Sequence, residues 1–163
     1  MCTDIHEHKT KLHDEAERCR RIVESSNEGI WKVSPDGVTV LVNPRMAEML
    51  GCGVDELHEK TLFDFVFEED LPAAHDHLRR CQAGEWTSLE WRLRRADGTE
   101  MWTLATCNPT FDPAGRLQGT VGHFTDLTSR KTAERKALDA NERLAIDAAE
   151  VGLYVIAIPE PER

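Results

Sequence analysis

Three tight turns, set between stretches of alternating apolar and polar residues, constrain this chain more than any other feature. They are Pro35-Asp36-Gly37, Ala96-Asp97-Gly98 and Asp112-Pro113-Ala114-Gly115. Turn residues of these types favour reversals of the chain, and the alternation beside them predicts strands that bury one face. The chain is therefore expected to form antiparallel strands joined by short turns.

Helical segments separate the first two predicted strands from the last three. Asn43-Pro44 supplies an N-cap and a first-turn proline to a helix that Gly51 ends. A short helical piece follows at 54–60, and Asp70 is expected to cap a longer helix that closes at Gly84. Two strands, a helical flank and three more strands predict an α+β fold whose sheet is packed on one side.

An amphipathic helix is predicted on each side of this region. In residues 1–26, the apolar side chains of Ile5, Leu12 and Val23 recur with the spacing of a coiled coil. Residues 129–150 combine alanine with charges of both signs, as in a connecting helix. We expect both helices to pair with a second copy of the chain, giving a homodimer.

An internal repeat links the two ends of the chain. The segments ERCRRIVESSNEGIWKV and NERLAIDAAEVGLYVI both place a helix before a glycine and an apolar strand. Their separation corresponds to one domain plus a linker. Residues 151–163 are therefore interpreted as the truncated first strand of a second, similar domain.

Three segments resemble a known family. GIWKVSPDGVTVLVNPRMAEMLG, EWRLRRADGTEMW and DPAGRLQGTVGHFTDLTSRKTAE are similar, in order and spacing, to the PAS domain and its C-terminal PAC region. The resemblance assigns residues 27–128 to a PAS domain of a bacterial signalling protein. It implies a five-stranded antiparallel sheet of order 2-1-5-4-3, helices over one face, and a pocket between them. The flanking helices would pair the domain and transmit its signal.

The family's register also implies which side chains line the pocket. They are Trp31, Val33, Met46, Met49, Leu62, Phe65, Leu78, Leu89, Trp91, Leu93 and Phe124. All are apolar, so they suit a small-molecule site or a core filled without a ligand. The two alternatives stay open at this point.

Cofactor binding is weighed against the same family. Haem-binding members carry a histidine ligand on the long helix, where this chain has His75 and His77, but Leu89 stands where oxygen-sensing members have arginine. Leu62 and Phe124 replace the cysteine and glutamine of the flavin-photochemical members. The cofactor is unknown; a domain without one is expected first, with haem or non-covalent FAD as alternatives.

Charge and composition exclude several other classes. The net charge of −10 argues against binding nucleic acid or anionic lipid, and Arg92, Arg94 and Arg95 are interpreted as a solvated strand face. The five cysteines form no CxxC pair, so no disulfide framework or metal site is predicted. No apolar run is long enough to span a membrane. A cytoplasmic location is expected.

The resemblance implies a sensory function. No phosphate-binding loop or hydrolase motif is present, so the chain itself is not expected to be an enzyme. It would sense a small molecule, redox change or other stimulus and signal through helical linkers to a histidine kinase or diguanylate cyclase in a longer parent. Asp126, Leu127 and Thr128 are the expected coupling point, with the Asp126 carboxylate capping the next helix. A purely structural dimerisation module and a haem or FAD redox or gas sensor are the alternatives.

Overall fold

The computed structural model describes residues 2–85 and 87–156. They divide into two compact units at Leu127: the first carries the sheet and the second is a helix. Among the described residues, no helix combines the length and the apolar character that crossing a membrane requires.

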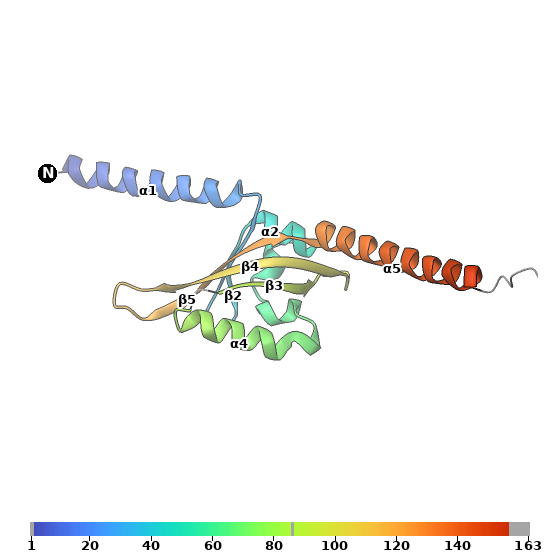
Figure 1. The fold of residues 1–163 in the computed structure, drawn as a ribbon. Coiled ribbons are helices and arrows are strands. Elements are labelled where there is room, and N and C mark those ends of the chain that lie inside the picture. The colour runs from blue at the N-terminus through green and yellow to red at the C-terminus, as the bar shows by residue number, and fades with distance from the viewer. Residues whose placement is uncertain (1, 86, 157–163) are drawn as a thin grey trace, which may run out of the picture. The chain divides into compact units, whose positions relative to one another are not determined.

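The first unit is organised around one antiparallel sheet (Figure 1). Its strands are β1 (Gly29–Val33), β2 (Thr39–Val42), β3 (Thr87–Arg94), β4 (Glu100–Phe111) and β5 (Leu117–Asp126). The order is β2-β1-β5-β4-β3, with every neighbouring pair antiparallel. This confirms the predicted fold class and strand order. The last strand in sequence, β5, lies in the middle of the sheet.

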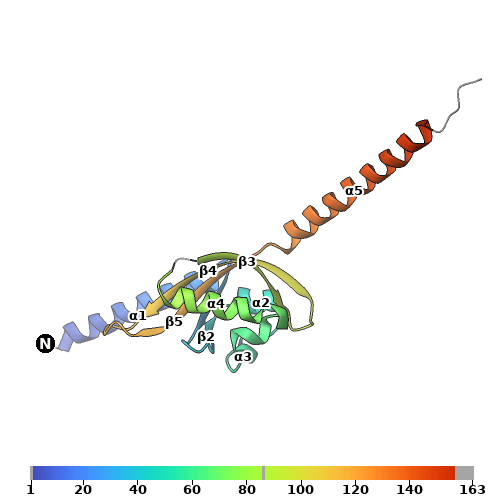
Figure 2. The same ribbon diagram turned by 60° about the horizontal axis from the view of Figure 1, so that its bottom comes forward.

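The helical flank covers one face of the sheet, with α4 lying along it (Figure 2). Its elements are α2 (Pro44–Leu50), α3 (Val54–Leu57), the 3₁₀ turns η1 (Leu62–Phe65) and η2 (Glu68–Asp70), and α4 (Leu71–Gln82). Strand alternation places Trp31, Trp91 and Phe124 on the covered face, where all three are buried. Burying side chains of this size supplies most of the free energy that holds helices and sheet together.

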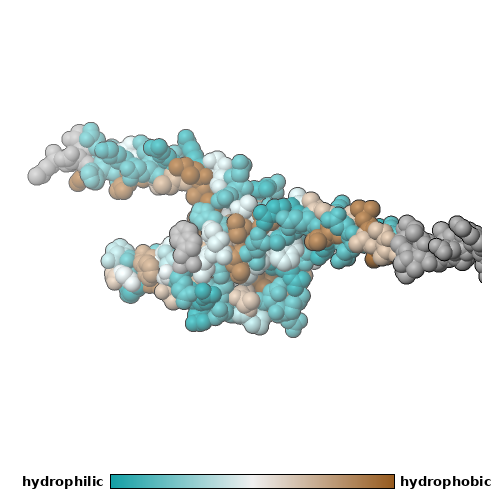
Figure 3. Space-filling view, viewed as in Figure 1, coloured by the Kyte–Doolittle hydropathy of each residue, from teal (hydrophilic) through white to brown (hydrophobic). Residues whose placement is uncertain are grey.

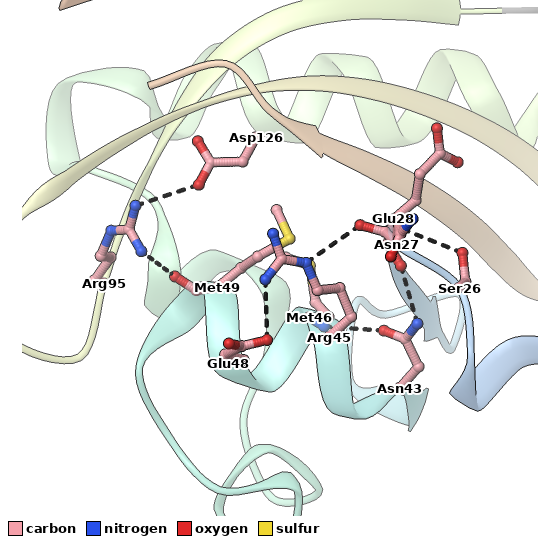
Figure 4. Close-up of polar contacts among 10 residues, drawn as sticks. All are labelled: Ser26, Asn27, Glu28, Asn43, Arg45, Met46, Glu48, Met49, Arg95 and Asp126. Carbon is pink, nitrogen blue, oxygen red and sulfur yellow. Dashed lines mark hydrogen bonds and ion pairs between the residues drawn. The ribbon is translucent and has the colours of Figure 1, made fainter. Parts of the chain in front are cut away.

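Asn43 joins three segments of the first unit through its side chain. Figure 4 shows its contacts with Glu28 and Met46. Its Oδ1 accepts hydrogen bonds from the backbone N–H groups of Ile30, at 2.8 Å, and Met46, at 2.9 Å. Its Nδ2 donates to the carbonyls of Val23 and Glu28, both at 3.0 Å. The predicted N-cap is confirmed, and the same amide also ties α1 and β1 to the start of α2.

Arg92 on β3 and Arg95 just after it contradict the prediction of a solvated strand face, whereas Arg94 is exposed. Arg92 is only 27% exposed and pairs with Asp70 and Glu69 at 2.7 Å and with Glu100 at 3.3 Å. The Asp70 side chain therefore does not cap α4 as expected, because its carboxylate is turned towards Arg92 instead. Arg95 is 26% exposed and also has partners. These contacts fasten the helical flank to the edge of the sheet.

The two flanking helices are α1 (Cys2–Glu24) and α5 (Thr128–Ile156). Figure 3 shows hydrophobic residues on the surface of each; they include Ile5, Leu12 and Ile22 on α1 and Leu138, Leu144 and Ile146 on α5. Residues 151–156 are helical, so the predicted strand is wrong for them. A lone strand has no partner for its backbone groups, whereas a helix pairs them within the segment. Residues 157–163 lie outside the described residues.

Candidate functional site

A small cavity lies between the sheet and the helical flank. Its volume is about 30 Å³, room for roughly two water molecules. Its walls come from the sheet and from η1 and α4; the lining residues are Trp31, Val33, Leu62, His77, Leu78, Trp91, Ala105, Thr106, Cys107, Thr120, Gly122 and Phe124. The cavity is a pocket of mainly apolar lining in the place where the sequence predicted one.

The predicted lining residues divide into three groups. Six of them line the cavity: Trp31, Val33, Leu62, Leu78, Trp91 and Phe124. Four others are buried in the surrounding core without lining it: Met46, Met49, Phe65 and Leu93. Leu89 is placed wrongly by the sequence: it is 37% exposed and lies outside the cavity. The reason is that β3 is an edge strand and the surface beside α4 leaves this position open.

Gly122 on β5 shapes the floor of the cavity and was missed by the sequence reasoning. It stands opposite Trp31 on β1 and Cys107 on β4. A Cβ atom added at this position would lie 2.6 Å from the ring of Phe124. Glycine is therefore required for the Phe124 ring to lie over this part of the sheet. A glycine inside a predicted strand was the available signal.

Two thiols lie beside the cavity, on facing elements. Burial raises the pKa of Cys107 on β4, and its hydrogen-bonded neighbour Cys81 on α4 raises it further. Burial likewise raises the pKa of Cys81. Both sulfurs are therefore neutral thiols at physiological pH, poor nucleophiles that serve as small apolar groups in the core.

Three buried polar atoms near α4 and β3 have no hydrogen-bond partner among the described residues. They are Nε2 of His77, Oγ1 of Thr87 and Nε1 of Trp91. By contrast, Nε1 of Trp31 donates to Oγ1 of Thr39 at 3.0 Å. A buried polar group without a partner costs free energy, so such groups are rare and need an explanation.

The two histidines of α4 occupy different environments. His75 is exposed and stacks on Phe63, with ring centroids 3.8 Å apart. His77 lines the cavity beside Trp91, at a centroid distance of 5.7 Å. Burial lowers the pKa of His77, and the positive charge of Arg80 lowers it further. The imidazole of His77 is therefore neutral at physiological pH.

The cavity does not fit the larger cofactors considered from sequence. A haem or an FAD ring system needs far more than the 30 Å³ present, and Trp31 and Phe65 pack edge to face across the core at 5.6 Å. His75 faces solvent rather than the cavity. Among the described residues, no three histidine, cysteine or acidic side chains gather as metal ligands. Water is the occupant that a cavity of this size admits as it stands.

Arg95 connects the helical flank to the end of β5 (Figure 4). Its Nη1 donates to the Met49 carbonyl at 2.7 Å, and its Nη2 lies 3.5 Å from Oδ2 of Asp126. Leu127 is buried and its N–H donates to the Trp102 carbonyl at 2.7 Å. The structure thus gives Asp126 a partner on the β3–β4 turn that the sequence reasoning missed. Capping of the next helix by Asp126 stays a prediction.

This sheet order, with helices on one face and a cavity beneath them, defines the PAS class of sensory domains. Residues 23–132 match the PAS fold family, and the chain belongs to it. The PAS domain is itself non-catalytic. Its sensory role is shared with domains of signalling proteins, sensor kinases among them.

Individual relatives agree with this assignment. Sporulation kinase C of Bacillus subtilis is 23% identical over 141 residues, covering 85% of this chain and 32% of the kinase. Biofilm dispersion protein BdlA of Pseudomonas aeruginosa is 28% identical over 97 residues, covering 58% of this chain and 23% of BdlA. The chain thus spans a third or less of these curated relatives.

A solved structure supports the fold separately. The crystal structure of a PAS domain from Colwellia psychrerythraea has a TM-score of 0.66 and 14% sequence identity. It covers 70% of this chain and 98% of the solved chain. At this identity the likeness establishes the fold alone.

Proposed function

We propose that this domain senses a stimulus at its buried cavity and relays it through Arg95 and Asp126 to an output domain in a longer protein. The observation that carries the proposal is the position of Arg95, which holds the Met49 carbonyl of α2 and the Asp126 carboxylate of β5 with one guanidinium. The similarity to a sporulation kinase supports a histidine kinase as the output, with a cyclic-di-GMP enzyme as the other candidate.

The relay follows from how α2 is packed. Met46 and Met49 of this helix are buried against β1, where a Cβ added at Gly29 would lie 2.5 Å from the Met46 sulfur. Because the side chains of α2 pack this closely against β1, a change in the core moves α2 as a whole. A shift of α2 moves the Met49 carbonyl, and Arg95 transfers that change to Asp126, two residues before α5 begins.

Homodimerisation through the flanking helices completes the proposal. A groove of about 570 Å³ runs between α1 and β2 and is lined in part by Ala16, Cys19 and Val23 of α1. Exposed apolar residues on α1 and α5 offer further surface for a second copy.

A structural module that only sets dimer geometry is the second candidate. The small size of the cavity, about 30 Å³, favours it, because a core that is nearly filled needs no ligand for its stability. The two candidates differ in what the Arg95 contact does. In a structural module the contact adds stability alone, whereas in a sensor it changes the output.

The test uses the full-length parent and its basal output activity. Arg95→Met removes the guanidinium and keeps the apolar stem, so we expect the output to change by about fivefold or more, the usual scale of coupling between sites. Asp126→Ala should change it in the same direction. The matched control is Arg116→Met, which removes an exposed arginine paired with Asp112 in the β4–β5 turn.

The outcome separates the two candidates. A shared change in Arg95→Met and Asp126→Ala, absent in Arg116→Met, supports the relay. If both variants fold, dimerise and keep the parent's output, the sensory proposal is wrong and the structural module stands. Thermal unfolding of each variant shows whether a lost output reflects unfolding.

A further inference from the structure

The three unpartnered polar atoms lie on one side of the core. Thr87 and Trp91 share a face of β3 and are 7% and 8% exposed, and His77 projects from α4 beside them. Other buried polar groups of this core are hydrogen-bonded. The Thr103 hydroxyl donates to the Trp91 carbonyl, and the Trp31 indole donates to the Thr39 hydroxyl. Unmet hydrogen-bonding capacity is thus concentrated at the α4–β3 boundary.

His77 forms the wall between the cavity and the surface. A second hollow, of about 320 Å³, opens to solvent between α4 and β3; its lining residues are Ala73, Asp76, His77, Arg80, Thr87, Ser88 and Leu89. His77 is the residue that lines both this surface hollow and the buried cavity. Turning its ring outward would join the two spaces into one, large enough for a small organic molecule.

The charges around this boundary are already paired. Arg80 contacts Glu85 at 2.6 Å, and Asp76 contacts Arg79 at 2.5 Å. No residue that lines the inner cavity carries a charge, because His77 is neutral there. A charged ligand would lose its hydration without gaining a counterion, which is costly. The site therefore suits an uncharged molecule.

The hydrogen-bonding groups of Trp91, Thr87 and His77 determine which polar group such a molecule needs. An indole N–H only donates, a threonine hydroxyl donates and accepts, and a neutral imidazole has one nitrogen of each kind. Trp91 can therefore pair only with a hydrogen-bond acceptor, and a carbonyl or hydroxyl oxygen is a common uncharged one. The exposed Leu89 and Ala73 of the surface hollow provide contact for an apolar tail.

We propose that the α4–β3 boundary is a binding site for a small uncharged molecule with a carbonyl or hydroxyl oxygen and a short apolar tail, with His77 as its gate. The oxygen accepts from Nε1 of Trp91 beside His77, and the tail lies in the surface hollow, which Thr87 also lines. The inference rests on the proposed function, since it names the ligand class of the same sensory cavity.

The experiment compares three probes of similar size on the full chain: methyl propyl ketone, its hydrocarbon isostere with a methylene group in place of the carbonyl oxygen, and butyrate. Binding is followed by the tryptophan indole N–H resonances in NMR spectra. The ketone should shift the Trp91 indole in a saturable way and leave the Trp31 indole, already bonded to Thr39, nearly unchanged. The hydrocarbon and butyrate should bind at least about threefold more weakly, the scale of one hydrogen bond.

Variants locate the interaction and the gate. Trp91→Phe should weaken ketone binding about threefold to tenfold, measured on the Leu78 methyl resonances. Glu90→Gln, a change at an exposed position of β3 that lines neither the cavity nor the surface hollow, should leave it unchanged. His77→Ala should speed exchange of the ketone between free and bound states.

Several results would overturn the proposal. They are an unshifted Trp91 indole, equal binding of ketone and hydrocarbon, or contacts from Trp91 to bound water only. This failure is distinguishable from failure of the sensory function. If Arg95→Met changes the parent's output while the ketone does not bind, the relay stands and the ligand class is wrong.

Discussion

Two polar clusters of the same core differ in how completely their hydrogen bonds are satisfied. At the start of α2, the side chain of Asn43 makes four hydrogen bonds and is 1% exposed. At the α4–β3 boundary, atoms of His77, Thr87 and Trp91 are just as inaccessible and have no partner among the described residues. The first cluster has the properties of a structural joint, and the second those of a binding site.

The difference separates a part of the core whose hydrogen bonds stabilise the fold from a part whose polar atoms can still form hydrogen bonds. A satisfied buried amide fixes one arrangement of the chain, because any other leaves several groups unpaired. Unsatisfied atoms instead lower stability until a ligand or water pairs with them. Removing a hydrogen-bonded polar group from this core should therefore lower the free energy of unfolding by more than removing an unpartnered one.

Asn43→Ala should have the largest effect. It removes all four hydrogen bonds and leaves two N–H groups and two carbonyls to find new partners, so we expect a loss of about 3 to 5 kcal/mol in the free energy of unfolding. Urea denaturation measures it. Asn27→Ala, an exposed asparagine in the preceding turn, is the control and should lose less than about 0.5 kcal/mol. A loss under about 1 kcal/mol for Asn43→Ala would show that these hydrogen bonds contribute little to the stability of the fold.

A pair of tryptophan variants gives the next largest effect. Trp31→Phe and Trp91→Phe remove similar volumes, but only the first breaks a hydrogen bond and strands the hydroxyl of Thr39. We expect Trp31→Phe to cost about 1 to 2 kcal/mol more than Trp91→Phe. Equal losses in urea denaturation would mean that Nε1 of Trp91 is already paired, in conflict with an unsatisfied cluster.

A pair of threonine variants should differ in sign. Thr87→Val replaces an unpartnered buried hydroxyl by a methyl group of similar size and should stabilise the chain by up to about 1 kcal/mol. Thr103→Val removes the bond to the Trp91 carbonyl and should destabilise it by about 1 kcal/mol. Differential scanning calorimetry of both variants tests the contrast. Destabilisation by Thr87→Val would show that the Thr87 hydroxyl has a hydrogen-bond partner in the folded chain.

The pH dependence contributed by His77 should be the smallest effect. Burial lowers the pKa of His77 in the folded chain below its ordinary value of 6.5. Its contribution to stability is therefore complete above about pH 6.5 and declines as the pH falls towards the lowered value, because the unfolded chain takes up the proton first. Below that value the decline stops.

Urea denaturation at several pH values checks this dependence. His77→Gln should remove that part of the slope, whereas His75→Gln, which changes an exposed ring on the same helix, should retain it. An unaltered slope in His77→Gln would show that the ring is accessible to solvent in the folded chain.

Local signals explain what the sequence predicted well. The turns at Asp36-Gly37 and Asp97-Gly98 and the cap at Asn43 act within a few residues, so they are visible in the chain itself. Strand order came from the family resemblance. Leu89 was misplaced because alternation predicts the face of a strand and not whether a helix covers it. Residues 151–156, part of the strand expected at 151–163, are helical instead.

Long-range pairing explains what was missed. The partners of Arg92 lie on η2 and β4, and those of Arg95 on α2 and β5, so nothing near either residue in the sequence indicates them. The unpartnered atoms of Thr87 and Trp91 are even harder to predict from sequence, because they are defined by having no hydrogen-bond partner among the described residues. Sequence patterns name candidate lining residues but do not count their hydrogen bonds.

The central position of β5 has a consequence for how the domain is made. The β1–β2 hairpin and the β3–β4 hairpin are joined in the sheet only through β5, the last strand in the sequence. A nascent chain that ends before residue 117 therefore holds two separate hairpins, each too small to be stable alone. The five-stranded sheet can therefore close only after β5 has been synthesised.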